Sequence, residues 1–123
     1  MEIKQSTLKN GLRIITAERP QIETVSLGVW VNTGAAAESE ADNGISHFIE
    51  HMVFKGTKKR NSLQISEDIE NVGGATNAYT SRHFTCFYAK MLKDDLELAT
   101  DVICDFITDP TFDAAEMSKE KEV

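Results

Sequence analysis

Two histidines and a glutamate lie close together in the stretch HFIEH, which runs from His47 to His51. If this stretch is helical, His47, Glu50 and His51 are spaced i, i+3 and i+4 and share one face of the helix. Neutral imidazoles one turn apart are suitable zinc ligands, and a nearby carboxylate can accept the proton of a water that the metal activates. The spacing therefore predicts a zinc site with His47 and His51 as ligands and Glu50 as general base.

The alternative for these three residues is a solvated polar face. Such faces are usually built from Lys, Glu, Gln and Arg, whereas two of the three histidines of the chain lie here. The pattern therefore favours metal binding. A catalytic zinc takes three protein ligands, and this stretch supplies two of them.

The segment around HFIEH favours a helix. Asp42 can cap its N-terminus, and Gly56 lies where a helix would end. An apolar stripe with helical spacing lies opposite the histidines, and we expect it to face the core. The stripe consists of Ile45, Phe48, Ile49 and Met52.

Strands and further helices are predicted around this segment. IKQSTL and LRIITA flank Asn10-Gly11, a strong hairpin signal, and TVSLGVWV alternates as a strand does. ATNAYTSRHFTCFYAKM favours one or two strands. SLQISEDIENV and DDLELATDVICDFIT favour helices, and Asp94 and Glu97 are spaced as a capping box. The apolar stripe of the second of these helices is Leu96, Ala99, Ile103, Phe106 and Ile107.

Two other segments have a simple interpretation. KGTKKR lacks the glycine spacing of a phosphate-binding loop, so Lys58, Lys59 and Arg60 are interpreted as a solvated loop.

Asp113 and Glu116 form a second capping-box pattern and open a last helix, which has no stop signal before Val123. We therefore expect residues 1–123 to be the N-terminal part of a longer protein, cut within that helix.

Composition narrows the class of protein. With 41% hydrophobic and 27% charged residues, the 123-residue chain has the composition of one small globular domain. The net charge of -7 argues against a nucleic-acid partner and would suit a basic peptide, although mild acidity also simply aids solubility. No apolar run is long enough to span a membrane, and the N-terminus has neither a signal-peptide nor a transit-peptide pattern. We expect a cytoplasmic, bacterial protein.

The order His-x-x-Glu-His is that of the inverted zinc peptidases. Together with this motif, four blocks resemble the pitrilysin-type metallopeptidases, above all the mitochondrial processing peptidase β subunit and its bacterial homologues. The blocks are LKNGLRII, GVWVNTGAAAE, GISHFIEHMVFKGT and VGGATNAYTSRHFTCFYAK. They follow the order and spacing of the family and cover nearly the whole chain.

The resemblance implies an α+β fold, in which helices pack on one face of a mixed, largely antiparallel sheet. It implies that Asn77 and Ala78 belong to an edge strand that hydrogen-bonds the substrate backbone. It also implies a third zinc ligand, a glutamate beyond Val123, and a carboxylate at Glu120 that orients a ligating histidine without binding the metal. A turn or strand-end role for Asn77, and an exposed helix position for Glu120, stay open as alternatives.

One position departs from the family pattern. The resemblance implies an acidic residue where this chain has His83, and we interpret His83 as an ordinary strand residue.

These features predict the N-terminal fragment of a zinc endopeptidase that hydrolyses peptide or presequence-like substrates. The alternative is a non-catalytic subunit or interaction domain of the same fold. Such proteins typically lose parts of the zinc motif, whereas His47, Glu50 and His51 are all present here. Without the third ligand the fragment alone should be inactive, and the apolar surface of an incomplete domain should promote self-association or a homodimer.

Overall fold

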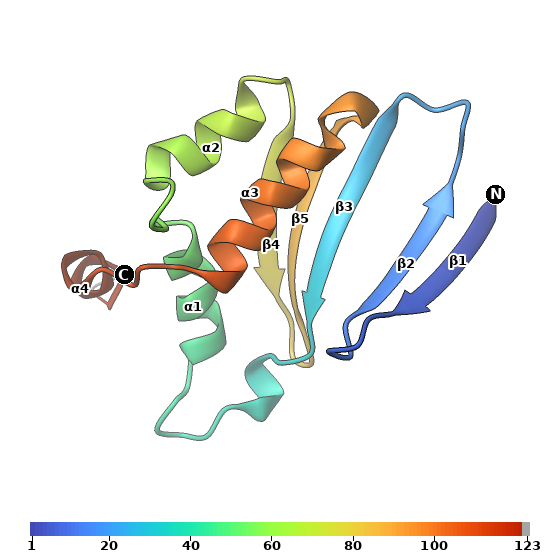
Figure 1. The fold of residues 1–123 in the computed structure, drawn as a ribbon. Coiled ribbons are helices and arrows are strands. Elements are labelled where there is room, and N and C mark those ends of the chain that lie inside the picture. The colour runs from blue at the N-terminus through green and yellow to red at the C-terminus, as the bar shows by residue number, and fades with distance from the viewer. Residues whose placement is uncertain (122–123) are drawn as a thin grey trace.

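Three strands, two helices, two more strands and two more helices follow one another along residues 1–121, the part of the chain that the computed structural model describes (Figure 1). The strands are β1 Glu2–Thr7, β2 Arg13–Glu18, β3 Thr24–Val31, β4 Ala75–Thr80 and β5 Thr85–Leu92. The helices are α1 Ile45–Val53, α2 Ser62–Glu70, α3 Leu96–Thr108 and α4 Ala114–Lys121, with 3-10 turns η1 Ala35–Ala37 and η2 Lys93–Asp95. Each helix among these residues is too short or too polar to reach across a lipid bilayer.

The first two strands form a hairpin. β1 and β2 pair antiparallel, with Thr7 opposite Arg13. In the loop between them Gly11 has a φ of +91°, which glycine adopts without strain, and Asn10 Oδ1 accepts a hydrogen bond from the Leu12 N–H. The predicted hairpin is therefore confirmed. It forms a two-stranded sheet of its own beside β3 (Figure 1).

β5 is the middle strand of the second sheet, whose order is β3-β5-β4. Phe87, Ala89 and Met91 of β5 are buried, whereas the intervening Lys90 and the final Leu92 are exposed. The alternation predicted for β3 is also found, because its inward-facing residues pack against the same core: Val25, Leu27, Val29 and Val31. β4 pairs with β5 along one side and forms an edge of this sheet.

Helix α3 lies across the sheet and forms the centre of the core (Figure 1). Three residues of its predicted apolar stripe are fully buried, Ala99, Ile103 and Phe106, and Val102 is buried with them. Leu96, at the first turn of the helix, is half-exposed. The predicted α+β fold is confirmed, and every strand pair within residues 1–121 is antiparallel.

The helix caps agree with the sequence only in part. Of the predicted capping box at α4 only the Asp113 half is found. The Asp113 Oδ1 accepts hydrogen bonds from the N–H groups of Ala115 and Glu116, whereas the Glu116 side chain accepts one from Lys119. The predicted capping box of Asp94 and Glu97 is wrong. Asp94 lies in η2 and Glu97 in the first turn of α3, and because η2 leads directly into α3, no free helix start is left for them to cap. The prediction that the last helix is unfinished at Val123 concerns residues beyond those described.

A largely buried arginine, Arg60, fixes the loop between α1 and α2. The Arg60 guanidinium donates hydrogen bonds to Asp68 (2.8 Å), Asp105 (3.0 Å) and Asp101 (2.6 Å). Burial alone would lower the pKa of Arg60, but the hydrogen bonds to these carboxylates raise that pKa above its usual value. The prediction of a solvated loop is therefore wrong for Arg60, whose long side chain reaches α2 and α3, whereas Lys59 is exposed.

Replacing Arg60 with alanine should lower the free energy of unfolding by about 3–5 kcal/mol, the usual cost of removing one partner of a buried ion pair. Asp105, whose side chain is 4% exposed, would keep only the hydrogen bond from the Thr57 hydroxyl. Urea denaturation measures the loss, and Lys59→Ala is the matched control, expected to change stability by less than about 0.5 kcal/mol. Equal stability of the two variants would show that the arginine does not hold the loop.

Candidate metal centre

Helix α1 carries HFIEH and begins where a distant carboxylate caps it. Gly44 is the N-cap residue, and Glu38 accepts hydrogen bonds from the N–H groups of Gly44 (2.9 Å) and Ser46 (2.7 Å). The hydrogen bond from Ser46, followed by that from Gly44, lowers the pKa of Glu38 below its usual value. The prediction that Asp42 caps this helix is wrong, because the Asp42 side chain instead accepts a hydrogen bond from Ser39.

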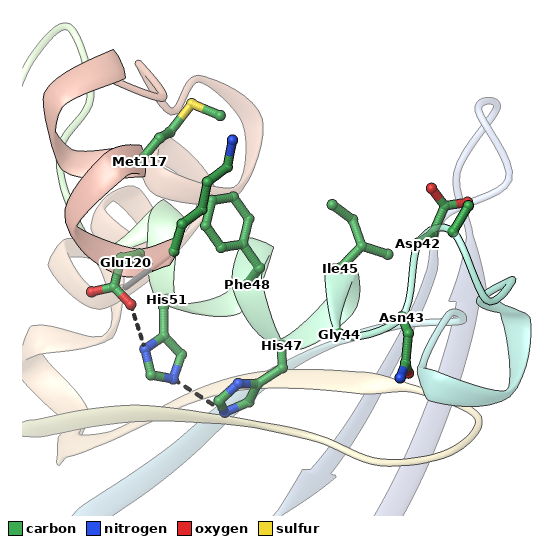
Figure 2. Close-up of a pocket in the computed structure, with 11 residues that line it drawn as sticks. Asp42, Asn43, Gly44, Ile45, His47, Phe48, His51, Met117 and Glu120 are labelled. Carbon is green, nitrogen blue, oxygen red and sulfur yellow. Dashed lines mark hydrogen bonds and ion pairs between the residues drawn. The ribbon is translucent and has the colours of Figure 1, made fainter. Parts of the chain in front are cut away.

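His47 and His51 turn toward each other from adjacent turns of α1 (Figure 2). Their Nε2 atoms lie 3.1 Å apart, and the ring centroids are 4.3 Å apart. One ligand atom each from His47, Glu50 and His51 can be chosen so that all three lie within 4.8 Å of one another. The structure thus brings together the three residues that the spacing placed on one helix face.

The other nitrogen of His51 contacts helix α4. His51 Nδ1 lies 3.2 Å from Glu120 Oε2, and Lys55 Nζ lies 3.2 Å from Glu120 Oε1 (Figure 2 shows the histidine contact). The hydrogen bond from Lys55 is the main cause of a pKa of Glu120 below its usual value, against the burial that raises it. An ionised carboxylate can only accept a hydrogen bond, so a hydrogen bond at this contact requires the His51 proton on Nδ1.

This arrangement fits a zinc ion. With the His51 proton on Nδ1, its Nε2 has a free lone pair, and this atom faces His47. Two nitrogen ligands at 2.0–2.1 Å from a tetrahedral zinc are separated by about 3.3–3.4 Å, close to the 3.1 Å between the two Nε2 atoms. A carboxylate behind one imidazole is also the usual outer support of a ligating histidine. The donor set and its spacing therefore suit zinc.

Glu50 lies on the sheet side of the two histidines and is only 8% exposed. The Thr80 hydroxyl, at the end of β4, donates a hydrogen bond to Glu50 Oε2. Sequence reasoning did not identify Thr80, although the alternation of β4 places it on the same face as Ala78, which packs against the core. The sequence patterns also did not identify Lys55 and Glu38 as residues that support the site. The one signal for Lys55 was its spacing, one helical turn after His51.

The apolar stripe of α1 is less buried than predicted. Met52 is fully buried and Phe48 is half-buried, but Ile45 and Ile49 are each 41% exposed. Both isoleucines line a cavity of about 300 Å³ between α1, the ends of β3 and β5, and α3. The prediction that the whole stripe faces the core is therefore wrong, because within residues 1–121 nothing fills this cavity. A second hollow of about 550 Å³ lies beside the histidines, against Met117 and Glu120 of α4.

The predicted substrate-binding residues lie on the edge strand. Asn77 and Ala78 are in β4, where Asn77 is exposed and its Oδ1 accepts a hydrogen bond from the Ala78 N–H. His83 is not a strand residue as predicted. It is exposed in the tight loop after β4, which Ser81 and Phe84 close by hydrogen bonds between the Ser81 N–H and the Phe84 carbonyl (2.8 Å) and between the Phe84 N–H and the Ser81 hydroxyl.

Comparison with known proteins finds peptidases at the level of both the family and individual relatives. The family described as Insulinase (Peptidase family M16) matches residues 13–123. The chain is 45% identical over 121 residues to the Bacillus subtilis protein named uncharacterized zinc protease YmxG, covering 98% of this chain and 30% of that protein. It is 43% identical over 122 residues to the rat mitochondrial-processing peptidase subunit beta, covering 99% of this chain and 25% of that protein.

A solved structure supports the fold. A protease from Helicobacter pylori superimposes with a TM-score of 0.94 over 98% of this chain and 29% of its own, at 24% sequence identity. The chain thus spans a quarter to a third of the length of the relatives it matches.

Replacing Glu120 with glutamine should weaken zinc binding by roughly 10- to 100-fold, the usual effect of losing the outer partner of a ligating histidine. The amide keeps the size of the side chain but removes the negative charge between His51 and Lys55. Competition with a chromophoric chelator measures the affinity. Glu116→Gln, one turn earlier on α4 and paired with Lys119, is the matched control and should bind zinc as the parent does. Unchanged affinity in Glu120→Gln would leave that carboxylate as an ordinary helix residue.

Proposed function

We propose that this chain, which belongs to the insulinase family of peptidases (peptidase family M16), forms the N-terminal part of a zinc endopeptidase. The observation that carries the proposal is the facing pair of Nε2 atoms of His47 and His51, 3.1 Å apart, with Glu50 on the same helix face. The names of the relatives, a zinc protease and a processing peptidase, support it.

Each residue of the site has a distinct role in this proposal. His47 and His51 hold zinc through Nε2, and Glu120 orients the His51 ring through Nδ1. A third ligand, a glutamate, is predicted to follow Val123 in the longer protein. The relatives support such a protein, since they are three to four times the length of the matched region.

When bound, zinc supplies a Lewis acid that activates water and polarises the peptide carbonyl. Glu50 accepts the proton of the attacking water and can pass it to the leaving amine. Its Oε2 already accepts a hydrogen bond from Thr80, which leaves Oε1 as the oxygen to take the proton. His47 and His51 must stay neutral to bind the metal, and the Nδ1 contact of His51 with Glu120 holds it in the required tautomer.

The proposed substrate is a peptide bound as an added strand. β4 is an edge strand whose ladder partner is β5, so its other side is available to an extended peptide at Asn77 and Ala78. The net charge of -7 favours a basic peptide through long-range attraction, as the sequence predicts. The cytoplasmic location, the inactivity of residues 1–123 alone and their self-association stay predictions.

Replacing Glu50 with glutamine in the intact protein should reduce peptide hydrolysis by about 10²–10⁴-fold, because the amide keeps the shape but cannot take the proton. Zinc content, measured by atomic emission after dialysis, should stay near that of the parent. A variant that retains most of its turnover would rule out Glu50 as the base. A parent protein with neither zinc nor chelator-sensitive turnover would instead support the alternative of a non-catalytic member of the fold.

Replacing Asn77 with alanine should lower kcat/KM by roughly 10-fold, the loss of about one hydrogen bond to substrate, and leave bound zinc unchanged. Steady-state turnover of a basic peptide over a range of concentrations measures this. Asn71→Ala, at the end of α2, is the control and should behave as the parent. If both asparagine variants turn over equally, Asn77 is a strand residue without a role in peptide binding.

A further inference from the structure

The Glu50 carboxylate is buried against β4, the strand that is proposed to pair with the peptide substrate. With 8% exposure the residue has little contact with water, and a buried carboxylate oxygen without a donor is costly. The Thr80 hydroxyl supplies that donor at Oε2. Thr80 is half-buried on β4, three residues after Asn77.

The strand end that carries Thr80 is held from both sides. Thr80 lies opposite Thr85 in the β4–β5 ladder, and the Thr85 hydroxyl donates to the Thr33 carbonyl (3.0 Å). The next residue, Ser81, accepts a hydrogen bond from the Ala35 N–H (3.1 Å). The hydroxyl that meets Glu50 therefore comes from a fixed backbone position.

A close backbone contact between Gly34 and Ser81 also holds the end of β4 in place. A Cβ on Gly34 would lie 2.2 Å from the Ser81 carbonyl oxygen, so only glycine lets the two loops approach this closely. The loop before α1 is thus locked to the end of β4. The helix that carries Glu50 and the strand that carries Thr80 are consequently placed relative to each other by backbone contacts, not only by the side-chain hydrogen bond.

We propose that Thr80 is a positioning residue for Glu50: its hydroxyl fixes one carboxylate oxygen so that the other faces the reacting water. This inference rests on the proposed function, because it assigns Thr80 a role through the general base. It also links two parts of the site, since the strand proposed to pair with the peptide is the strand that orients the base. Thr80 makes this contribution without touching substrate or metal.

Three substitutions in the intact, zinc-loaded protein test the role. Thr80→Val replaces the hydroxyl with a methyl group of similar size, and Thr80→Ala removes it without adding bulk. Both should lower kcat by roughly 10- to 100-fold, the usual effect of a lost hydrogen bond to a charged group, with KM within about twofold. Thr80→Ser keeps the donor and should restore most of the turnover. Bound zinc should be unchanged in all three.

Two further measurements separate positioning from general damage. Thr76→Val removes a hydroxyl from the same face of β4, where it donates to the Tyr88 carbonyl and not to Glu50, and should leave kcat within about twofold. In the Glu50→Gln background, Thr80→Val should cost less than about threefold, because a group that acts through Glu50 loses its effect when the base is gone.

The outcomes distinguish the two proposals. If Glu50→Gln is inactive but Thr80→Val and Thr80→Ala turn over as the parent does, the role of Thr80 is wrong and the proposed function stands. The role is also overturned if Thr80→Ser loses as much as Thr80→Val, if Thr76→Val loses as much, or if the losses of Thr80→Val and Glu50→Gln simply multiply. If Glu50→Gln stays active, the general-base assignment fails and the role of Thr80 fails with it.

Discussion

The site depends on burying a carboxylate next to two histidines that must stay accessible. Glu50 is 8% exposed, whereas His47 is exposed and His51 half-buried on the same helix face. Burying such a group is unfavourable unless a donor meets it, and within residues 1–121 that donor is the Thr80 hydroxyl. The hydrogen bond between Thr80 and Glu50 therefore contributes to the position of α1 against β4, together with apolar packing.

The ends of α1 are fixed by groups that take no part in the proposed reaction. Glu38 caps its first turn through two backbone N–H groups, and the close approach of Gly34 to Ser81 locks the preceding loop to the end of β4. After the helix, Arg60 ties the following loop to carboxylates of α2 and α3. These contacts hold the helix at both ends, so the geometry of its histidines does not rely on the helix alone.

Two apolar surfaces of the structure are not covered by other parts of residues 1–121. Ile45 and Ile49 of α1 line a cavity instead of packing closely, and Trp30 on the outer face of the sheet is 62% exposed. The described chain matches a quarter to a third of the length of its relatives. In those longer proteins additional chain is available to cover such surfaces, which agrees with the proposal that the peptidase site is assembled from more than this region.

The sequence by itself determined the features that depend on neighbouring residues. Helical spacing put His47, Glu50 and His51 on one face, Asn10-Gly11 made the hairpin turn, and Asp113 capped α4. The resemblance to a known family pointed to Glu120, which short-range patterns alone would have left as an exposed helix residue. Residue preferences and helical spacing are sufficient to predict such features, because the groups that interact lie a fixed, short number of residues apart.

Only the tertiary structure decided which groups meet across the fold. Thr80 lies 30 residues after Glu50, and Arg60 reaches Asp105 across 45 residues. A periodic pattern tells which face of an element is polar or apolar, but not what is packed against that face. For this reason the burial of Ile45 was predicted wrongly, and the donor that holds Glu50 could not be predicted at all.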